Sequence, residues 1–323
     1  MSDRPKTSGS LRAPVWRWLA TAGRVGVLAV LGYFVYSTVS ELVAGGIDDR
    51  LRLSFSGLGA ASVVLVAYYI LYAQGMVLIL RGAGSKIRLR DAFALNFISN
   101  LGKYVPGGIW PLVGRYALAS RYGVEREHAV MSTVYENLLS VVAGSIVVVI
   151  AVGPLATDAL GVPLWTLPLV VLAVMTCLHP MVFSRLSRWA LRLLKSDAPE
   201  MALSLRTMVI VVLHYMVTWC VGGIAFLLFV SSIVPADSGR LSLYIGAHAA
   251  ASIGGLLVLF APGGIGVREA ILAVMLTPVH GSVIAVAVGV ATRLWSTVVE
   301  LVISAVAAGF VGRGASEDTR GGE

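Results

Sequence analysis

One segment determines the architecture of this chain: Asn96-Phe97-Ile98-Ser99-Asn100-Leu101-Gly102-Lys103-Tyr104-Val105-Pro106-Gly107-Gly108-Ile109-Trp110-Pro111-Leu112-Val113-Gly114-Arg115-Tyr116. It lies between long apolar segments, yet Pro106, Gly107 and Gly108 interrupt a helix and free backbone N–H and C=O groups. Irregular backbone at membrane depth is tolerated only inside protein or along a water-filled cavity. Since Lys103 and Arg115 flank the interruption, we predict a helix–break–helix site here.

The segment has a second copy near the other end of the chain. This copy reads Ser252-Ile253-Gly254-Gly255 and then Phe260-Ala261-Pro262-Gly263-Gly264-Ile265-Gly266-Val267-Arg268-Glu269. The residues that follow each copy also match, with seven identities between 132–143 and 296–307. We interpret the two copies as an internal repeat. Paired interrupted segments in two halves of a chain point to the binding site of a transporter.

Composition places the chain in a membrane. Of its 323 residues, 57% are hydrophobic and 13% are charged, against about 25% charged in soluble domains. The net charge of +8 does not indicate nucleic acid, because the basic residues lie mostly in short loops, where they set topology. Cys177 and Cys220 lie in apolar segments and have neither zinc nor disulfide spacing. We therefore predict no metal site and no cofactor.

The predicted fold class is an all-α integral membrane protein with about six full spans and two re-entrant or broken helical hairpins in an inverted-topology repeat. The predicted spans are about 25–44, 57–80, 128–152, 164–178, 203–233 and 281–310. The predicted broken segments are about 91–120 and 241–277, and 181–196 is predicted to be an amphipathic surface helix. Arms of about 12 residues span about 18 Å, which is too short for about 30 Å of hydrocarbon. The first arm of the second segment is longer, and the sequence leaves open whether it crosses.

The domain organisation follows from these segments. We predict a polar basic tail over 1–20, a single transmembrane domain over 21–312 and a polar tail over 313–323, with repeat halves at about 81–152 and 235–312. The basic loops put both termini in the cytoplasm. Three spans separate the two breaks, so the copies point in opposite directions. The first break then opens from the cytoplasm and the second from outside.

The residues at the two breaks suit an anionic head group. Half-helices that begin near Gly108 and Gly264 present free N–H groups and positive dipole ends. The candidate ligands of a phosphate or head group are Lys103, Tyr104, Gly107, Gly108, Arg115, Gly263, Gly264 and Arg268. The alternative is that Lys103 and Arg115 reach the cytoplasmic interface and only fix topology. Topology does not explain Arg268, which lies outside the cytoplasmic loops.

Several ionisable residues at membrane depth are candidates for gating or coupling. They are Glu136, Glu269, Arg293 and Glu300. A charge at the centre of a span costs about 2.5–3.5 kcal/mol on the milder insertion scales. Glu136 and Glu300 occupy matching places in the repeat, and two uses stay open for them: ion pairs with Arg268 or Arg293 that lock the halves, or a protonatable switch. His214 and His248 are either part of a proton path or packing residues.

The quoted motifs resemble the paired motifs of the lysylphosphatidylglycerol synthase transmembrane, or flippase-like, family. The similarity rests on Asn100-x-Gly102-Lys103-Tyr104-x-Pro106-Gly107-Gly108 with Trp110, Gly114 and Arg115, and on Pro262-Gly263-Gly264-Ile265-Gly266-x-Arg268-Glu269. In the best-understood members this domain moves an aminoacylated phospholipid between leaflets. The resemblance implies lipid translocation. It does not imply synthase activity, because this chain has no soluble aminoacyl-transferase domain.

The leading hypothesis is a lipid flippase of the inner (cytoplasmic) cell membrane. It would move an anionic phospholipid or a polyprenyl-phosphate-linked sugar, with the phosphate near Lys103, Arg115 and Arg268. The alternative is a non-transporting membrane adaptor for a glycosyltransferase or lipid-modifying synthase of the cell envelope. No nucleotide-binding loop, nucleophile elbow or zinc-protease motif is present. We therefore do not predict an enzyme.

Overall fold

The computed structural model describes residues 53–104, 110–159, 203–257, 264 and 266–317. Every regular element within these ranges is helical. Four of the described helices are long and apolar enough to cross a membrane: α2 (Phe55–Gly82), α5 (Arg126–Ala159), α8 (Leu205–Ser231) and α11 (Ser282–Glu317). They confirm the spans predicted at 57–80, 128–152, 203–233 and 281–310. The spans predicted at 25–44 and 164–178 and the amphipathic helix predicted at 181–196 lie outside the described residues.

Helices α2 and α8 begin in the same way. The Ser54 hydroxyl accepts a hydrogen bond from Gly57 N at 3.2 Å, and the Ser204 hydroxyl accepts one from Thr207 N at 3.2 Å. A serine at this position satisfies one of the backbone donors that the first helical turn leaves unpaired. Each helix therefore starts at a defined residue, although the apolar run that follows is nearly uniform.

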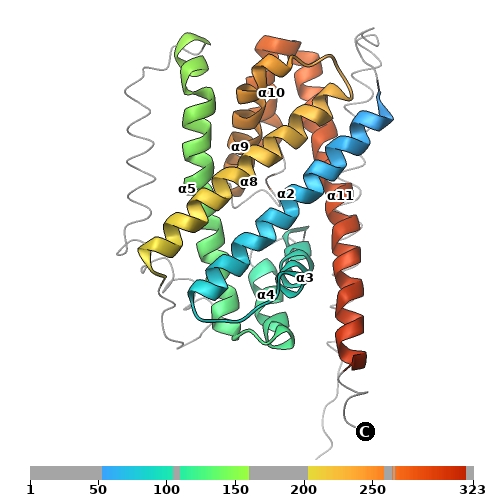
Figure 1. Ribbon diagram of the computed structural model, residues 1–323. Coiled ribbons are helices and arrows are strands. Elements are labelled where there is room, and N and C mark those ends of the chain that lie inside the picture. The colour runs from blue at the N-terminus through green and yellow to red at the C-terminus, as the bar shows by residue number, and fades with distance from the viewer. Residues whose placement is uncertain (1–52, 105–109, 160–202, 258–263, 265, 318–323) are drawn as a thin grey trace, which may run out of the picture.

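The same two helices lie side by side and run in opposite directions (Figure 1). The first turn of each lies against the last turn of the other. A Cβ added to Gly57 would be 3.1 Å from Ser232 Cβ, and one added to Gly82 would be 2.5 Å from Thr207 Cγ2. Small residues at such crossings let membrane helices approach closely.

Both predicted broken segments are interrupted in the structure. The first consists of α3 (Leu89–Asn100), the short helix η1 (Leu101–Tyr104) and α4 (Trp110–Ala119). The second consists of α9 (Leu241–Leu257) and α10 (Val267–His280), preceded by the short helix η3 (Ser238–Arg240). The longest arm, α9, has 17 residues and therefore spans about 26 Å, which is less than about 30 Å of hydrocarbon. The motif residues 105–109, 258–263 and 265 lie outside the described part of the chain.

The broken segments lie at opposite ends of the molecule, and the first arm of each packs on the last long helix of the other half. Figure 1 shows α3 and α4 at the lower end and α9 and α10 at the upper end. Tyr135 of α5, Trp219 of α8 and Ile253 of α9 share one buried cluster. Phe97 of α3 and Ile303 of α11 share another, together with α2. The two core clusters thus join residues from the first and second halves of the chain.

Candidate functional site

A buried ion pair holds the first broken segment together. Arg115 of α4 and Glu136 of α5 form it, and both side chains are 2% exposed. Asn96 of α3 donates a hydrogen bond to Glu136 Oε1 at 3.0 Å, and Asn100 donates one to Asn96 Oδ1 at 2.6 Å. Charge-assisted hydrogen bonds of this kind offset the cost of taking two charges out of water. The network therefore ties α3, α4 and α5 together within one half of the chain.

This geometry changes the role that the sequence indicated for Arg115. We predicted its guanidinium among the ligands of a phosphate, or at the cytoplasmic interface. In the structure Arg115 is buried and held by Glu136, so neither a head group nor bulk water reaches it in this conformation. The structure also pairs Glu136 with Arg115 rather than with Arg268 or Arg293, since α4 brings Arg115 against α5.

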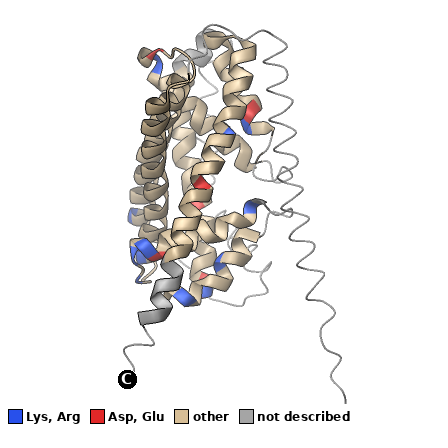
Figure 2. Cartoon of the chain, turned by 90° about the vertical axis from the view of Figure 1, so that its right-hand side faces the viewer, with Lys and Arg blue, Asp and Glu red and all other residues tan. Residues whose placement is uncertain are grey.

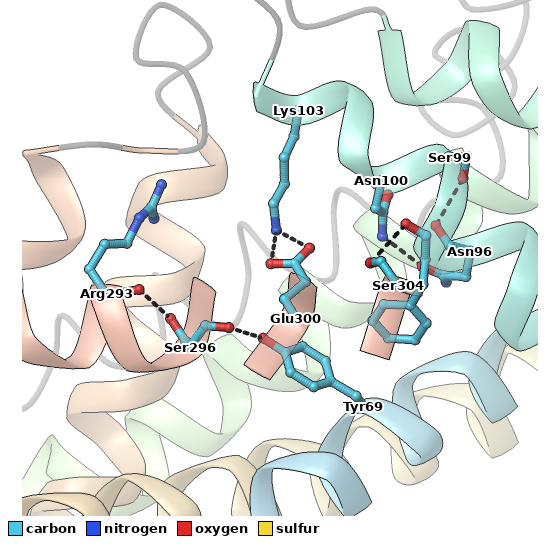
Figure 3. Close-up of polar contacts among 10 residues, drawn as sticks. Tyr69, Asn96, Ser99, Asn100, Lys103, Arg293, Ser296, Glu300 and Ser304 are labelled. Atoms are coloured by element: carbon cyan, nitrogen blue, oxygen red, sulfur yellow. Dashed lines mark hydrogen bonds and ion pairs between the residues drawn. The ribbon is translucent and has the colours of Figure 1, made fainter. Parts of the chain in front are cut away.

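A second ion pair joins the two halves. Lys103 ends the first arm of the first broken segment, and its Nζ lies 2.5 Å from Oε1 and 2.6 Å from Oε2 of Glu300 on α11 (Figure 3). The Glu300 side chain is 6% exposed, whereas that of Lys103 is 35% exposed. The carboxylate is therefore buried in the bundle, and the lysine reaches it from a more open side.

Polar groups one turn away on each side of Glu300 face the same direction. Ser296, Glu300 and Ser304 follow one another at four-residue spacing, which places them on one face of α11. The hydroxyl of Tyr69 donates to Ser296 O at 3.5 Å, and the hydroxyl of Ser304 donates to Phe97 O at 3.4 Å (Figure 3). This face of α11 is therefore the one that meets the first half of the chain.

The second break leads into α10 through a glycine cap. Gly266 has φ of 87°, a value that glycine adopts without strain, and its N–H donates to Glu269 Oε2 at 2.7 Å. The Glu269 carboxylate therefore lies at the positive end of α10. We predicted an anionic head group at this helix end and a gating role for Glu269. The structure places the protein's own carboxylate there, as a cap.

Arg268 extends from the first turn of α10 toward α9. Its Nη2 donates to the Ser252 hydroxyl at 2.7 Å, and within the described ranges no carboxylate forms an ion pair with it. Its side chain crosses Gly255 closely, because a Cβ at Gly255 would be 2.4 Å from Arg268 Cγ. Gly264, with φ of 71°, also lies against Gly255. Two glycines thus make room for one arginine between α9 and α10.

A small cavity of about 20 Å³ lies beside this arginine, between α9, α10 and α11. Polar side chains form much of its lining: His248, Ser252, Arg268, Glu269, Thr292 and Arg293. A volume of this size holds about one water molecule and excludes a lipid head group. His248 Nε2 is buried without a hydrogen-bond partner in the described chain, whereas His214 Nε2 bonds to Leu71 O at 2.7 Å, as a packing residue does.

Several of the remaining predicted residues are not described by the structure. Gly107, Gly108, Gly263 and the side chain of Tyr104 lie outside what the structure describes. Among the other aromatic residues near the first break, the Tyr116 ring lies 5.3 Å from the Arg126 guanidinium carbon.

Sequence reasoning assigned no role to Asn96 or Ser252. In the structure these two residues contact Glu136 and Arg268, respectively. They stand at the same distance before the proline of the two motif copies, so aligning the copies could have identified them.

Comparison with known proteins agrees with this architecture. The family model described as "Lysylphosphatidylglycerol synthase TM region" matches residues 19–304. No curated protein matches the chain. The membrane domains of this family are often linked to lipid flipping or translocation. Since the match covers most of the 323 residues, the chain belongs to the lysylphosphatidylglycerol synthase transmembrane-region family.

Proposed function

We propose that this protein is a lipid flippase that moves an anionic phospholipid or a polyprenyl-phosphate-linked sugar between the leaflets of the cell membrane. The observation that carries the proposal is Arg268, a partly buried guanidinium whose contact in the described chain is an uncharged hydroxyl. A charge at this depth is costly unless it is paired. A lipid phosphate would supply the missing negative charge while the hydrocarbon chains stayed in the bilayer.

The arrangement of the helices supports an inverted-topology repeat. Gly57 lies against Ser232, and Gly82 lies against Thr207. The two contacts correspond, because Thr207 follows Gly57 by 150 residues and Ser232 follows Gly82 by 150 residues. The same shift relates the caps Ser54 and Ser204. We therefore extend the predicted halves so that they begin with α2 and α8. In this scheme the two breaks are re-entrant and open toward opposite leaflets, and the spans predicted at 25–44 and 164–178 complete the six.

Alternating access to one central site follows from such a repeat. In our proposal each half moves largely as a rigid body. The buried Arg115–Glu136 pair keeps the first half together, while the Lys103–Glu300 pair lies between the halves and opens during transport. Arg268 binds the phosphate, and no covalent chemistry is required, so we propose a transporter and not an enzyme.

The charge distribution supports an orientation. Lys and Arg gather at the end of the molecule that holds α3 and α4 (Figure 2). The exposed basic residues in the helix ends and connections at this end are Arg81, Lys86, Arg88, Arg90, Arg121 and Arg126. Cytoplasmic loops carry an excess of such residues. We therefore propose that this end and both termini face the cytoplasm.

The decisive test is leaflet exposure of labelled lipids in liposomes that contain the purified protein. Separate liposome samples carry labelled phosphatidylglycerol, a labelled polyprenyl-phosphate sugar or labelled neutral phosphatidylcholine. We expect Arg268→Ala to reduce the movement of an anionic lipid by at least about tenfold, because the proposed ligand of the phosphate is lost. Arg240→Ala is the matched control, since Arg240 is an exposed arginine of the same half and, in the described part of the chain, pairs with nearby Asp237.

The proposal fails if Arg268→Ala moves lipid at the parental rate. If the parental protein moves none of the lipids but retains an envelope glycosyltransferase or synthase after purification from membranes, the adaptor function is correct instead.

A further inference from the structure

Lys103, the cation at the first break, is already bound to a carboxylate from the other half of the protein. Both oxygens of Glu300 contact its Nζ, at 2.5 and 2.6 Å (Figure 3). A carboxylate in this geometry occupies the position that a phosphate would take at an ammonium group. We infer that Glu300 is a tethered competitor of the lipid phosphate, which holds Lys103 until the phosphate displaces it. This inference rests on the proposed function.

The two breaks differ in what a phosphate must displace. At Arg268 the described contact is the Ser252 hydroxyl, so an arriving phosphate adds a counter-charge and removes none. At Lys103 the phosphate must first remove the buried carboxylate of Glu300. The order of binding follows from this difference. The phosphate binds Arg268 first, and it reaches Lys103 only when Glu300 leaves.

Release of Glu300 also loosens the contact between the halves. The neighbouring hydrogen bonds of the same α11 face, from Tyr69 to Ser296 and from Ser304 to Phe97, are long at 3.5 and 3.4 Å. Hydrogen bonds at these distances are weak. Of these three contacts on the α11 face, the ion pair is therefore the strongest. Since the ligand binds better to the form in which the pair is open, phosphate binding shifts the protein toward that form.

The test measures lipid affinity separately from transport. Purified protein in nanodiscs is titrated with phosphatidylglycerol and, in a separate experiment, with polyprenyl phosphate. Phosphatidylcholine is the neutral reference. We expect Glu300→Gln to bind both anionic lipids about tenfold more tightly than the parent, because it removes the competing charge and keeps the side-chain shape. Lys103→Gln should show no gain, and the double variant should resemble Lys103→Gln. Ser304→Ala, one turn away on the same face, is the matched control and should bind as the parent does.

Each outcome decides a different point. If the parent binds anionic lipid through Arg268 but Glu300→Gln binds no tighter, the inference is wrong and the proposed function stands. The inference is also wrong if the double variant gains as much as Glu300→Gln, since the gain would not come from Lys103. If neither protein prefers anionic lipid over phosphatidylcholine, the inference and the proposed ligand both fail. Should Glu300→Gln not fold, Glu300→Asp replaces it, and its shorter carboxylate should give a smaller gain in the same direction.

Discussion

Removing one partner of the buried Arg115–Glu136 pair should destabilise the protein far more than removing both. In Glu136→Ala the Arg115 guanidinium stays buried without a counter-charge, and the amide of Asn96 loses its acceptor. Breaking a buried pair from one side costs about 3–5 kcal/mol. The double variant Arg115→Met with Glu136→Leu buries no charge and fills similar volume. Its stability should therefore be near that of the parent, as replaced buried pairs often are.

Thermal unfolding in detergent micelles measures this difference. At about 2–4 °C for each kcal/mol, Glu136→Ala should lower Tm by about 10 °C. The control is Glu125→Ala, which removes a glutamate that is 73% exposed and lies just before the same helix. Its effect should stay within about 0.5 kcal/mol.

Two results would refute the reasoning. One is a Glu136→Ala variant as stable as the control, since the pair would then not hold the hairpin. The other is a double variant no more stable than Glu136→Ala. A third result would revive the protonatable switch: Glu136→Gln with parental stability and no lipid movement would show that Glu136 couples transport rather than holds the fold.

Two further substitutions test the second break. Gly255→Ala should reduce transport nearly as much as Arg268→Ala, because its methyl group would displace the arginine stem, whereas Gly254→Ala meets only the flexible end of Ile271. Equal lipid movement by the two alanine variants would show that Gly255 does not position the arginine. Glu269→Ala should cost about 0.5–2 kcal/mol, measured by thermal unfolding, because α10 loses its N-terminal cap. An unchanged Tm would contradict the capping role.

The sequence predicted where the helices break better than it predicted which side chains form ion pairs. Proline and glycine interrupt a helix by local chemistry, so the breaks after Lys103 and before Arg268 could be predicted from two motifs, and the described arms agree with them. An ion pair depends instead on which helices meet. By sequence the candidate partner of Glu300 was Arg293, seven residues earlier on the same helix, and the structure adds Lys103 from the other half as a partner that the sequence did not indicate. Asn96 begins the first quoted segment, but the sequence assigned it no role and did not indicate that it donates to Glu136.

The positions of the two ion pairs in the chain imply that they differ in function. A pair within one half keeps its geometry when that half moves as a body, so Arg115–Glu136 can persist through the whole cycle. A pair between the halves has to change when they move, and Lys103–Glu300 is such a pair. In the proposed repeat both glutamates occupy corresponding positions, yet Glu136 binds a cation of its own half and Glu300 binds one of the opposite half. Because separating opposite charges at membrane depth is costly, the second pair opens more readily when another negative charge compensates for the loss of Glu300. An anionic head group would be that compensation, so movement of the halves would be linked to the presence of the lipid.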